Sequence, residues 1–119
     1  MLLALGNIDL NPLIDAMIAM AKDETNNHEL NIEAGKGSWK HEDGWGIAYL
    51  QNEEWVIKKS TKAIFNDPEI NNLRNLKTRL AIIHIRKKMG SETSIVNTHP
   101  FIIQKGEPKC YVFCHNGFI

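Results

Sequence analysis

The sequence predicts a mixed α+β domain in which antiparallel strands and helices pack in layers. Helical spacing of apolar residues follows Pro12, and two apolar runs within residues 47–57 flank a polar turn, as in a β-hairpin. Residues 80–86 are apolar on both faces, which is typical of a strand covered on both sides. With 119 residues, the chain has the length of one ordinary domain.

The composition of the chain argues against some classes of partner. Apolar residues make up 43% of the chain, which is enough for a core, and 14 basic residues balance 14 acidic ones. This balance gives no field that favours nucleic acid or an acidic membrane, so neither is an expected partner. Asn7 and Asp9 interrupt the apolar start too early for a signal peptide, and no run approaches the ~20 apolar residues of a membrane span. We expect a cytoplasmic protein with reduced cysteines.

The first elements are a short strand and a helix. Residues Leu2–Leu5 form an apolar run that predicts a buried strand. Asn11 and Pro12 then suit the N-cap and the first helical position, and the helix is expected to close after Lys22. Its apolar positions are Leu13, Ile14, Met17, Ile18, Met20 and Ala21. Residues 25–40 show no period and predict a long surface loop, of the kind that often forms a lid or a site wall.

The middle of the chain predicts a hairpin and a second helix. The hairpin strands are Ile47–Leu50 and Trp55–Ile57, joined by a polar turn. A helix is expected from Asp67 to about Leu76, with Asp67 as N-cap and Pro68 at the first helical position.

The last part of the chain alternates strands with loops. The doubly apolar strand Leu80–Arg86 belongs in the middle of a layered structure. Pro100 stands at the entry of the next strand, where proline is tolerated. The remaining segments are a loop over Lys87–Thr98, a strand over His99–Ile103, a turn over Gln104–Lys109 and a final strand over Cys110–His115.

The final strand ends in a polar corner formed by His115, Asn116 and Gly117. Asn116 offers a side-chain amide, and Gly117 allows its backbone N–H to approach a ligand closely. Such paired donors hold an oxyanion, and stabilisation of that oxyanion often contributes most of the rate enhancement in acyl transfer.

Five histidines and two cysteines raise the question of a metal site or a reactive thiol. On one strand, Cys110 and Cys114 lie ~13 Å apart, which is too far for one zinc ion or for a disulfide. The histidines are scattered without a metal-ligand spacing, so neither a metal nor another cofactor is expected. Cys114 and His115 point to opposite faces, but His84 or His99 remains able to reach Cys114 from another element. A buried, unreactive Cys114 is the favoured interpretation.

Three further segments each have two interpretations. Arg86, at a strand end beside a glycine-containing loop, suits either capture of a carboxylate or a surface salt bridge. The segment Asp43–Gly46 fits a binding wall or a hydrophobic Trp45 between turn glycines. Residues Asn97, Thr98 and His99 fit a pocket or plain turn chemistry.

Together these segments resemble one family, the class II glutamine amidotransferases, and especially its stand-alone branch. The resemblance covers most of the chain and depends on four motifs in the family's order and approximate spacing. They are His41-Glu-Asp-Gly-Trp-Gly-Ile-Ala-Tyr-Leu50, His84-Ile-Arg86, Asn97-Thr-His-Pro-Phe101 and Phe113-Cys-His-Asn-Gly117.

The resemblance implies a fold, an activity and a set of site residues. The fold is the N-terminal-nucleophile hydrolase αββα sandwich of antiparallel sheets, and the activity is release of ammonia from glutamine through a cysteine thioester. Arg86 would bind the substrate α-carboxylate, and Asn116 with the Gly117 N–H would form the oxyanion hole. The other residues expected to line or brace the pocket are Asp43, Gly44, Trp45, Gly46, Asn97, Thr98 and His99.

The sequence also departs from the family pattern. The family nucleophile is a cysteine at residue one whose α-amine acts as the base, but Met1 to Glu24 contains no Cys, Ser or Thr. Met89 replaces a small hydroxyl residue common in relatives, and nothing follows Ile119 where the family domain continues. We therefore expect a truncated domain that is inactive as this chain, with a homodimer or a second chain covering its exposed sheet. The alternatives are a binding or assembly module on the same scaffold and a hydrolase that uses Cys114.

Overall fold

The chain folds as a mixed α+β structure with antiparallel sheets, as the sequence predicts, and this architecture is compatible with the N-terminal-nucleophile hydrolase fold. The computed structural model describes residues 1–24, 39–107 and 109–117. A four-stranded sheet has the order β1-β4-β2-β3, and a hairpin of β5 and β6 forms a second sheet. The strands are β1 (Leu2–Asp9), β2 (Trp45–Gln51), β3 (Glu54–Ser60), β4 (Lys77–Ile85), β5 (Phe101–Gln104) and β6 (Cys110–Phe113).

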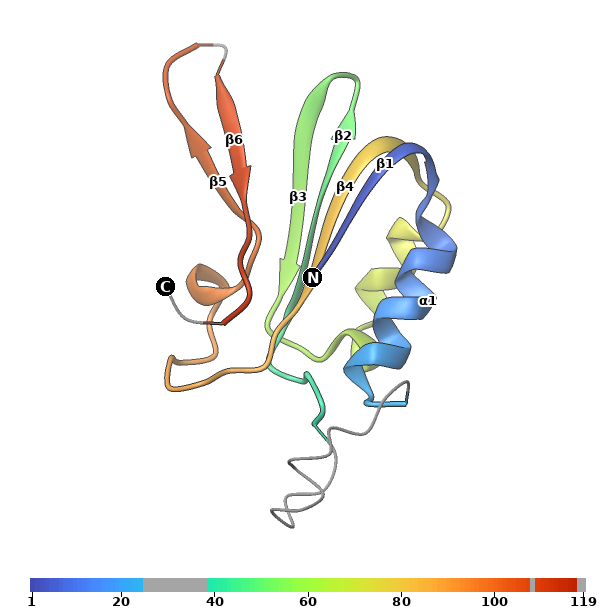
Figure 1. Cartoon of the computed structure of the whole chain (residues 1–119), viewed down its shortest axis with the longest axis vertical. Helices are drawn as coiled ribbons and strands as arrows, with labels where there is room; N and C mark the ends of the chain where they lie inside the picture. Colours follow the sequence, from blue (N-terminus) through green and yellow to red (C-terminus); the bar gives the residue numbers. More distant parts are fainter. Residues whose placement is uncertain (25–38, 108, 118–119) are drawn as a thin grey trace.

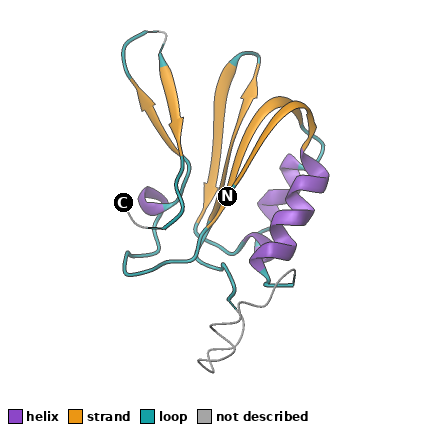
Figure 2. Cartoon of the chain, viewed as in Figure 1, coloured by secondary structure: helices purple, strands orange, loops and turns teal. Residues whose placement is uncertain are grey.

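The larger sheet is covered by helices on one face and approached by the hairpin on the other (Figure 1). Helix α1 (Leu10–Ala21) and two 3-10 helices, Ile64–Asn66 and Pro68–Leu73, pack on the first face (Figure 2). The hairpin of β5 and β6 stands on the side away from α1. The start of β1 and the end of β6 come down toward the same end of the structure, near where β4 ends.

Strand β4, which was predicted to lie in the middle of a layered structure, is an inner strand of the sheet because it pairs with β1 on one side and β2 on the other. Ala81, Ile83 and Ile85 face α1 and are buried. The opposite face is only partly covered within the described residues, since Ile82 is half-buried whereas His84 is buried. Both faces of β4 are therefore covered, as predicted, only at the carboxyl end of the strand, where the second sheet begins.

The N-terminal strand and helix are present, but their boundaries differ from the prediction. Strand β1 continues to Asp9 and lies at the sheet edge, where Leu3 and Leu5 are exposed rather than buried. The helix cap is Asp9 and not Asn11, because the Asp9 carboxylate accepts a hydrogen bond from the Asn11 backbone N–H at 3.1 Å. Pro12 is still tolerated, since N–H groups in the first helical turn have no partner within the helix.

The hairpin and the Asp67 cap are confirmed. Strands β2 and β3 pair around Asn52 and Glu53, and Asp67 accepts from the backbone N–H of Glu69. The predicted helix after Asp67 is shorter and tighter than an α-helix, since Pro68–Leu73 form a 3-10 helix. Among the described residues, no helix is long and apolar enough to span a membrane.

The second sheet begins two residues later than predicted. His99 and Pro100 are buried against β2, joined by a cis peptide bond, and β5 starts at Phe101. Strand β6 ends at Phe113 rather than His115, so Cys114 and His115 follow the strand. The loop predicted over residues 25–40 lies outside the described residues except for its last two positions.

Candidate functional site

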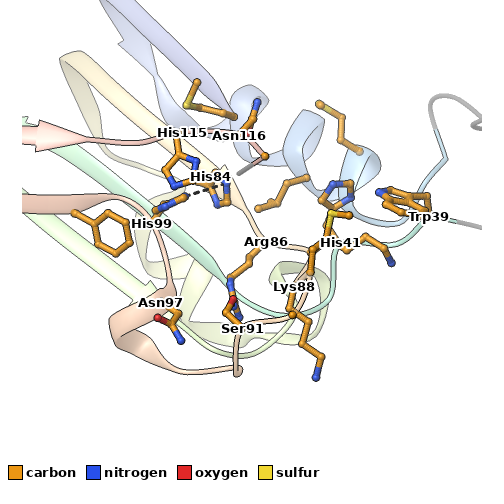
Figure 3. Close-up of a pocket in the computed structure, with 18 residues that line it drawn as sticks. Trp39, His41, His84, Arg86, Lys88, Ser91, Asn97, His99, His115 and Asn116 are labelled. Atoms are coloured by element: carbon orange, nitrogen blue, oxygen red, sulfur yellow. Dashed lines mark hydrogen bonds between the residues drawn. The ribbon is translucent and has the colours of Figure 1, made fainter. Parts of the chain in front are cut away.

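A cavity of about 870 Å³ opens where β4 ends, and its size is typical of small-ligand sites. Its wall comes from segments far apart in the sequence: the first residue, the segment after residue 38, the end of β4 with the following loop, and the ends of the β5–β6 hairpin. Figure 3 shows Arg86 in the middle of this wall, with His84, His99 and His115 gathered on one side and Trp39 and His41 on the other.

Arg86 follows the last residue of β4 and is 5% exposed. Its guanidinium donates to the Ser91 Oγ at 2.7 Å, to the Glu92 carbonyl at 3.0 Å and to the Asp43 carbonyl at 3.4 Å. None of the carboxylates that the structure describes forms an ion pair with it. The surface salt bridge considered as an alternative is therefore wrong.

The segment Asp43–Gly46 supports the cavity from behind and does not line it. The Asp43 N–H donates to the Arg86 carbonyl at 3.1 Å, and the Arg86 N–H donates to the Gly44 carbonyl at 2.8 Å. Trp45 lies in the core and donates its indole N–H to Asp67 at 3.0 Å. Gly46 lies beneath His99, because a Cβ at Gly46 would collide with the His99 carbonyl oxygen.

The segment Asn97–His99 combines turn chemistry with a place in the wall. Asn97 donates its side-chain amide to the Glu92 carbonyl at 3.1 Å, and the Thr98 hydroxyl donates to the Ser94 carbonyl at 2.7 Å. Asn97 and His99 line the cavity, whereas Thr98 is fully buried behind it. Both interpretations of this segment therefore describe part of its structure.

Three histidine rings form one cluster (Figure 3). His84 Nε2 lies 3.3 Å from His99 Nδ1, and the His99 and His115 ring centroids are 4.4 Å apart. Burial, followed by repulsion from neighbouring imidazoles, lowers the pKa of His84 to about 3 and the pKa of His99 to about 4. Both rings are neutral near pH 7, so each offers a lone pair rather than a positive charge.

Cys114 joins this cluster, as the sequence allowed. Its Sγ and one ring nitrogen each from His84 and His99 all lie within 4.8 Å of one another. Burial raises the pKa of Cys114 to about 11, so the thiol stays protonated and is a weak nucleophile. Cys110 and Cys114 are both free, in agreement with the excluded disulfide.

The corner at Asn116 and Gly117 also lines the cavity, together with Met1. Gly117 has a φ of +79°, a conformation that glycine adopts without strain. Met1 is about half exposed, but its α-amine is partly buried, and this burial lowers the pKa of the amine below the ordinary value of 8.0. The structure thus brings Met1, Arg86, Asn116 and Gly117 around one cavity.

Several residues of the wall were missed by sequence reasoning. The Lys87 ammonium lies over the Trp39 ring, 4.5 Å from the ring centroid. Lys87 also donates a hydrogen bond to the Lys40 carbonyl at 3.1 Å. His41 lies in the cavity wall, and burial lowers its pKa. His41 opens one of the four motifs, which was the available signal, whereas nothing in the sequence near Trp39 marked it.

Comparison with known proteins identifies related chains. The family model for class II glutamine amidotransferases matches residues 17–119. An uncharacterized protein of Methanocaldococcus jannaschii, MJ1515, is 38% identical over 76% of this chain and 27% of its own length. Escherichia coli YafJ and a Haemophilus influenzae protein, both provisionally named glutamine amidotransferases, are 28% and 37% identical over 72% and 65% of this chain. The chain spans only 26–34% of the length of these relatives.

Proposed function

The chain belongs to the class II glutamine amidotransferases, and from that membership we propose that its cavity binds glutamine or a related amino acid. In this proposal Arg86 holds the α-carboxylate of the ligand, and the Asn116 side chain with the Gly117 N–H receives the amide oxygen. Asn97 and His99 shape the wall, while Asp43, Gly44, Trp45, Gly46 and Thr98 hold the wall in place.

The observation that carries the proposal is the buried charge of Arg86. A buried charge is stabilised only when it is paired or fully hydrogen-bonded, and the described residues supply no carboxylate to Arg86. A guanidinium has five N–H donors, and three hydrogen bonds to Asp43, Ser91 and Glu92 leave two of them for a ligand. A ligand carboxylate matches the charge of these donors.

The chemistry proposed for the complete site is amide hydrolysis through a thioester. A thiol on the first residue, with its own α-amine as base, attacks the amide carbon, and the oxygen develops negative charge beside Asn116 and Gly117. Burial lowers the pKa of the Met1 α-amine, which favours the unprotonated form that acts as a base, and this supports the arrangement. Residues 1–24 supply no thiol or hydroxyl, so we propose that the chain as it stands binds the ligand without releasing ammonia.

Calorimetric titration with L-glutamine and L-glutamate tests the proposal. We expect binding at millimolar ligand, loss of at least about tenfold in affinity for Arg86→Gln, and no ammonia release. Arg79→Gln is the matched control, because Arg79 also belongs to β4 but is exposed and paired with Glu53. Absence of heat at millimolar ligand, or equal losses in the two variants, would contradict the proposal.

A further inference from the structure

Three metal-ligating side chains meet beside the cavity, each brought by a different segment. His84 belongs to the end of β4, His99 precedes β5 and Cys114 follows β6. One ring nitrogen from each histidine and the Cys114 Sγ all lie within 4.8 Å of one another. His84 and His99 are buried, and Cys114 is half-buried.

The spacing of these atoms is close to that of a tetrahedral zinc site. Zn–N bonds of ~2.0–2.1 Å place two coordinating nitrogens ~3.3 Å apart, and a Zn–S bond of ~2.3 Å places sulfur ~3.5 Å from each nitrogen. His84 Nε2 and His99 Nδ1 are already 3.3 Å apart. The sulfur lies within 4.8 Å of both nitrogens, so it needs to approach by about 1.3 Å at most.

We propose that His84, His99 and Cys114 form a binding site for Zn²⁺ or a similar thiophilic metal ion. Binding forms a metal–thiolate bond, and the thiol proton leaves to solvent. Three protein ligands leave the fourth position of a tetrahedral ion to water or to a molecule in the cavity. This proposal depends on the geometry of the cluster alone and stands independently of glutamine binding.

The donor set selects the class of ion. Two imidazoles and a thiol suit zinc and other late transition metals, whereas Mg²⁺ and Ca²⁺ require oxygen ligands. The positive charges of the Met1 amine, Lys59 and Arg86 face the histidines and repel any cation. Affinity must therefore come from bonds to the thiolate and the imidazoles, which again favours a thiophilic ion.

The segments that carry His84 and His99 are held in place before any ion binds. Gly46 pairs with His84 across β2 and β4, and the main chain of His99 rests directly on Gly46. Pro100 is fully buried next to it. Rigid support of this kind reduces the cost of ordering a metal site.

The competing interpretation is a hydrogen-bonded histidine pair beside an inert cysteine. A hydrogen bond between His84 and His99 explains their 3.3 Å contact. It leaves the buried Nδ1 atoms of His84 and His115 without a partner among the described residues, although buried polar atoms usually have one. An ion bound to His84 Nε2 would not pair these Nδ1 atoms either, so the atoms do not distinguish the two interpretations.

Titration with Co²⁺ distinguishes the two interpretations, because a cobalt–thiolate bond produces a charge-transfer absorption band in the near ultraviolet. We expect the chain to show this band and Zn²⁺ to displace the cobalt stoichiometrically. Cys114→Ser should abolish the band and weaken Zn²⁺ binding by at least about 100-fold, and His99→Gln should weaken it at least about tenfold. Cys110→Ser changes the other cysteine near Cys114 in the sequence, and it should leave the cobalt–thiolate band and the Zn²⁺ affinity unchanged.

Alkylation by iodoacetamide gives a second readout that needs no variant. Zn²⁺ should slow modification of Cys114 at least about tenfold, as read by mass spectrometry of the two cysteine peptides, and leave Cys110 unaffected. Absence of the cobalt–thiolate band in the unmodified chain would overturn the proposal. Equal zinc affinity in the unmodified chain and in Cys114→Ser would also overturn it.

Discussion

Asp67 joins the helical layer to the sheet through a single carboxylate. It is 4% exposed and accepts hydrogen bonds from the Trp45 indole at 3.0 Å and from the Glu69 N–H at 3.2 Å. Burial acts to raise the pKa of Asp67, but hydrogen bonds from Ser60, Glu69 and Trp45 outweigh it and lower the pKa below 3.8. The folded chain therefore stabilises the charged form of Asp67.

This balance predicts a pH-dependent effect for Asp67→Asn. A lowered pKa in the folded state contributes stability that is complete above the unfolded value of about 3.9 and is lost as the pH falls through the folded pKa. The substitution should cost about 1–2 kcal/mol in the free energy of unfolding at pH 7 and progressively less below about pH 4. Urea unfolding of both proteins at several pH values measures this difference. A cost that does not change with pH would contradict the account.

The environment of Arg86 could be predicted from the sequence only in part. Its position at the end of an apolar strand suggested an anion site or a surface ion pair, and the pattern alone did not decide between them. The decision depends on burial and on the loop from Ser91 to Glu92, which folds back to accept its hydrogen bonds. A loop path without periodicity is not encoded in any local pattern.

At the scale of elements, the contact between β2 and the segment before β5 organises the site. Gly46 is the residue of β2 that allows the His99 main chain to lie on the sheet, next to His84 of β4. A side chain at this position would push His99 away from His84, since the colliding atom is a backbone carbonyl.

Gly46→Ala should therefore damage both stability and the site. The expected cost is roughly 1–3 kcal/mol in the free energy of unfolding, which is typical of overpacking. Because His99 moves, the variant should also lose most of its Co²⁺ or Zn²⁺ binding even at temperatures where it is folded. Thermal unfolding followed by circular dichroism, combined with the cobalt titration, measures both effects. A variant with unchanged stability and unchanged metal spectrum would show that His99 does not rest on Gly46.

The helices and strands could be predicted where their apolar residues recur at helical or strand spacing. The hairpin of β2 and β3, the central strand β4 and the Asp67 cap follow directly from such patterns. The N-cap of α1 was misplaced because Asp9 and Asn11 are both good caps, and the strand before Asp9 proved longer than its apolar run. The 3-10 form of Pro68–Leu73 was missed, since caps do not distinguish it from an α-helix.

At the scale of the whole molecule, the site depends on segments that meet only in three dimensions. Met1 and the corner after β6 are more than 100 residues apart in the sequence, yet both line the cavity with Arg86. The four motifs predicted this assembly through resemblance, whereas spacing alone did not bring Cys114 together with His84 and His99. Such long-range contacts have no periodic signature, so they lie beyond the reach of local sequence patterns.

The predicted homodimer, or a second chain on the exposed sheet, stays a prediction. The hairpin of β5 and β6 carries apolar side chains that are about half exposed on both of its faces: Ile103, Tyr111 and Phe113 share one face, and Ile102 lies on the other. Exposed apolar groups on neighbouring strands are typical of surfaces that another polypeptide covers.

Titration of the ¹⁵N-labelled chain with L-glutamine, followed by two-dimensional NMR, tests the proposed glutamine site most directly. We expect the signals of the Arg86 guanidinium, the Asn116 side-chain amide and the Gly117 backbone N–H to shift together with one dissociation constant. The signals of Arg79, which also belongs to β4 but is exposed, should stay unchanged. Signals of Arg86, Asn116 and Gly117 that remain fixed at millimolar L-glutamine, or shifts confined to other parts of the chain, would contradict it.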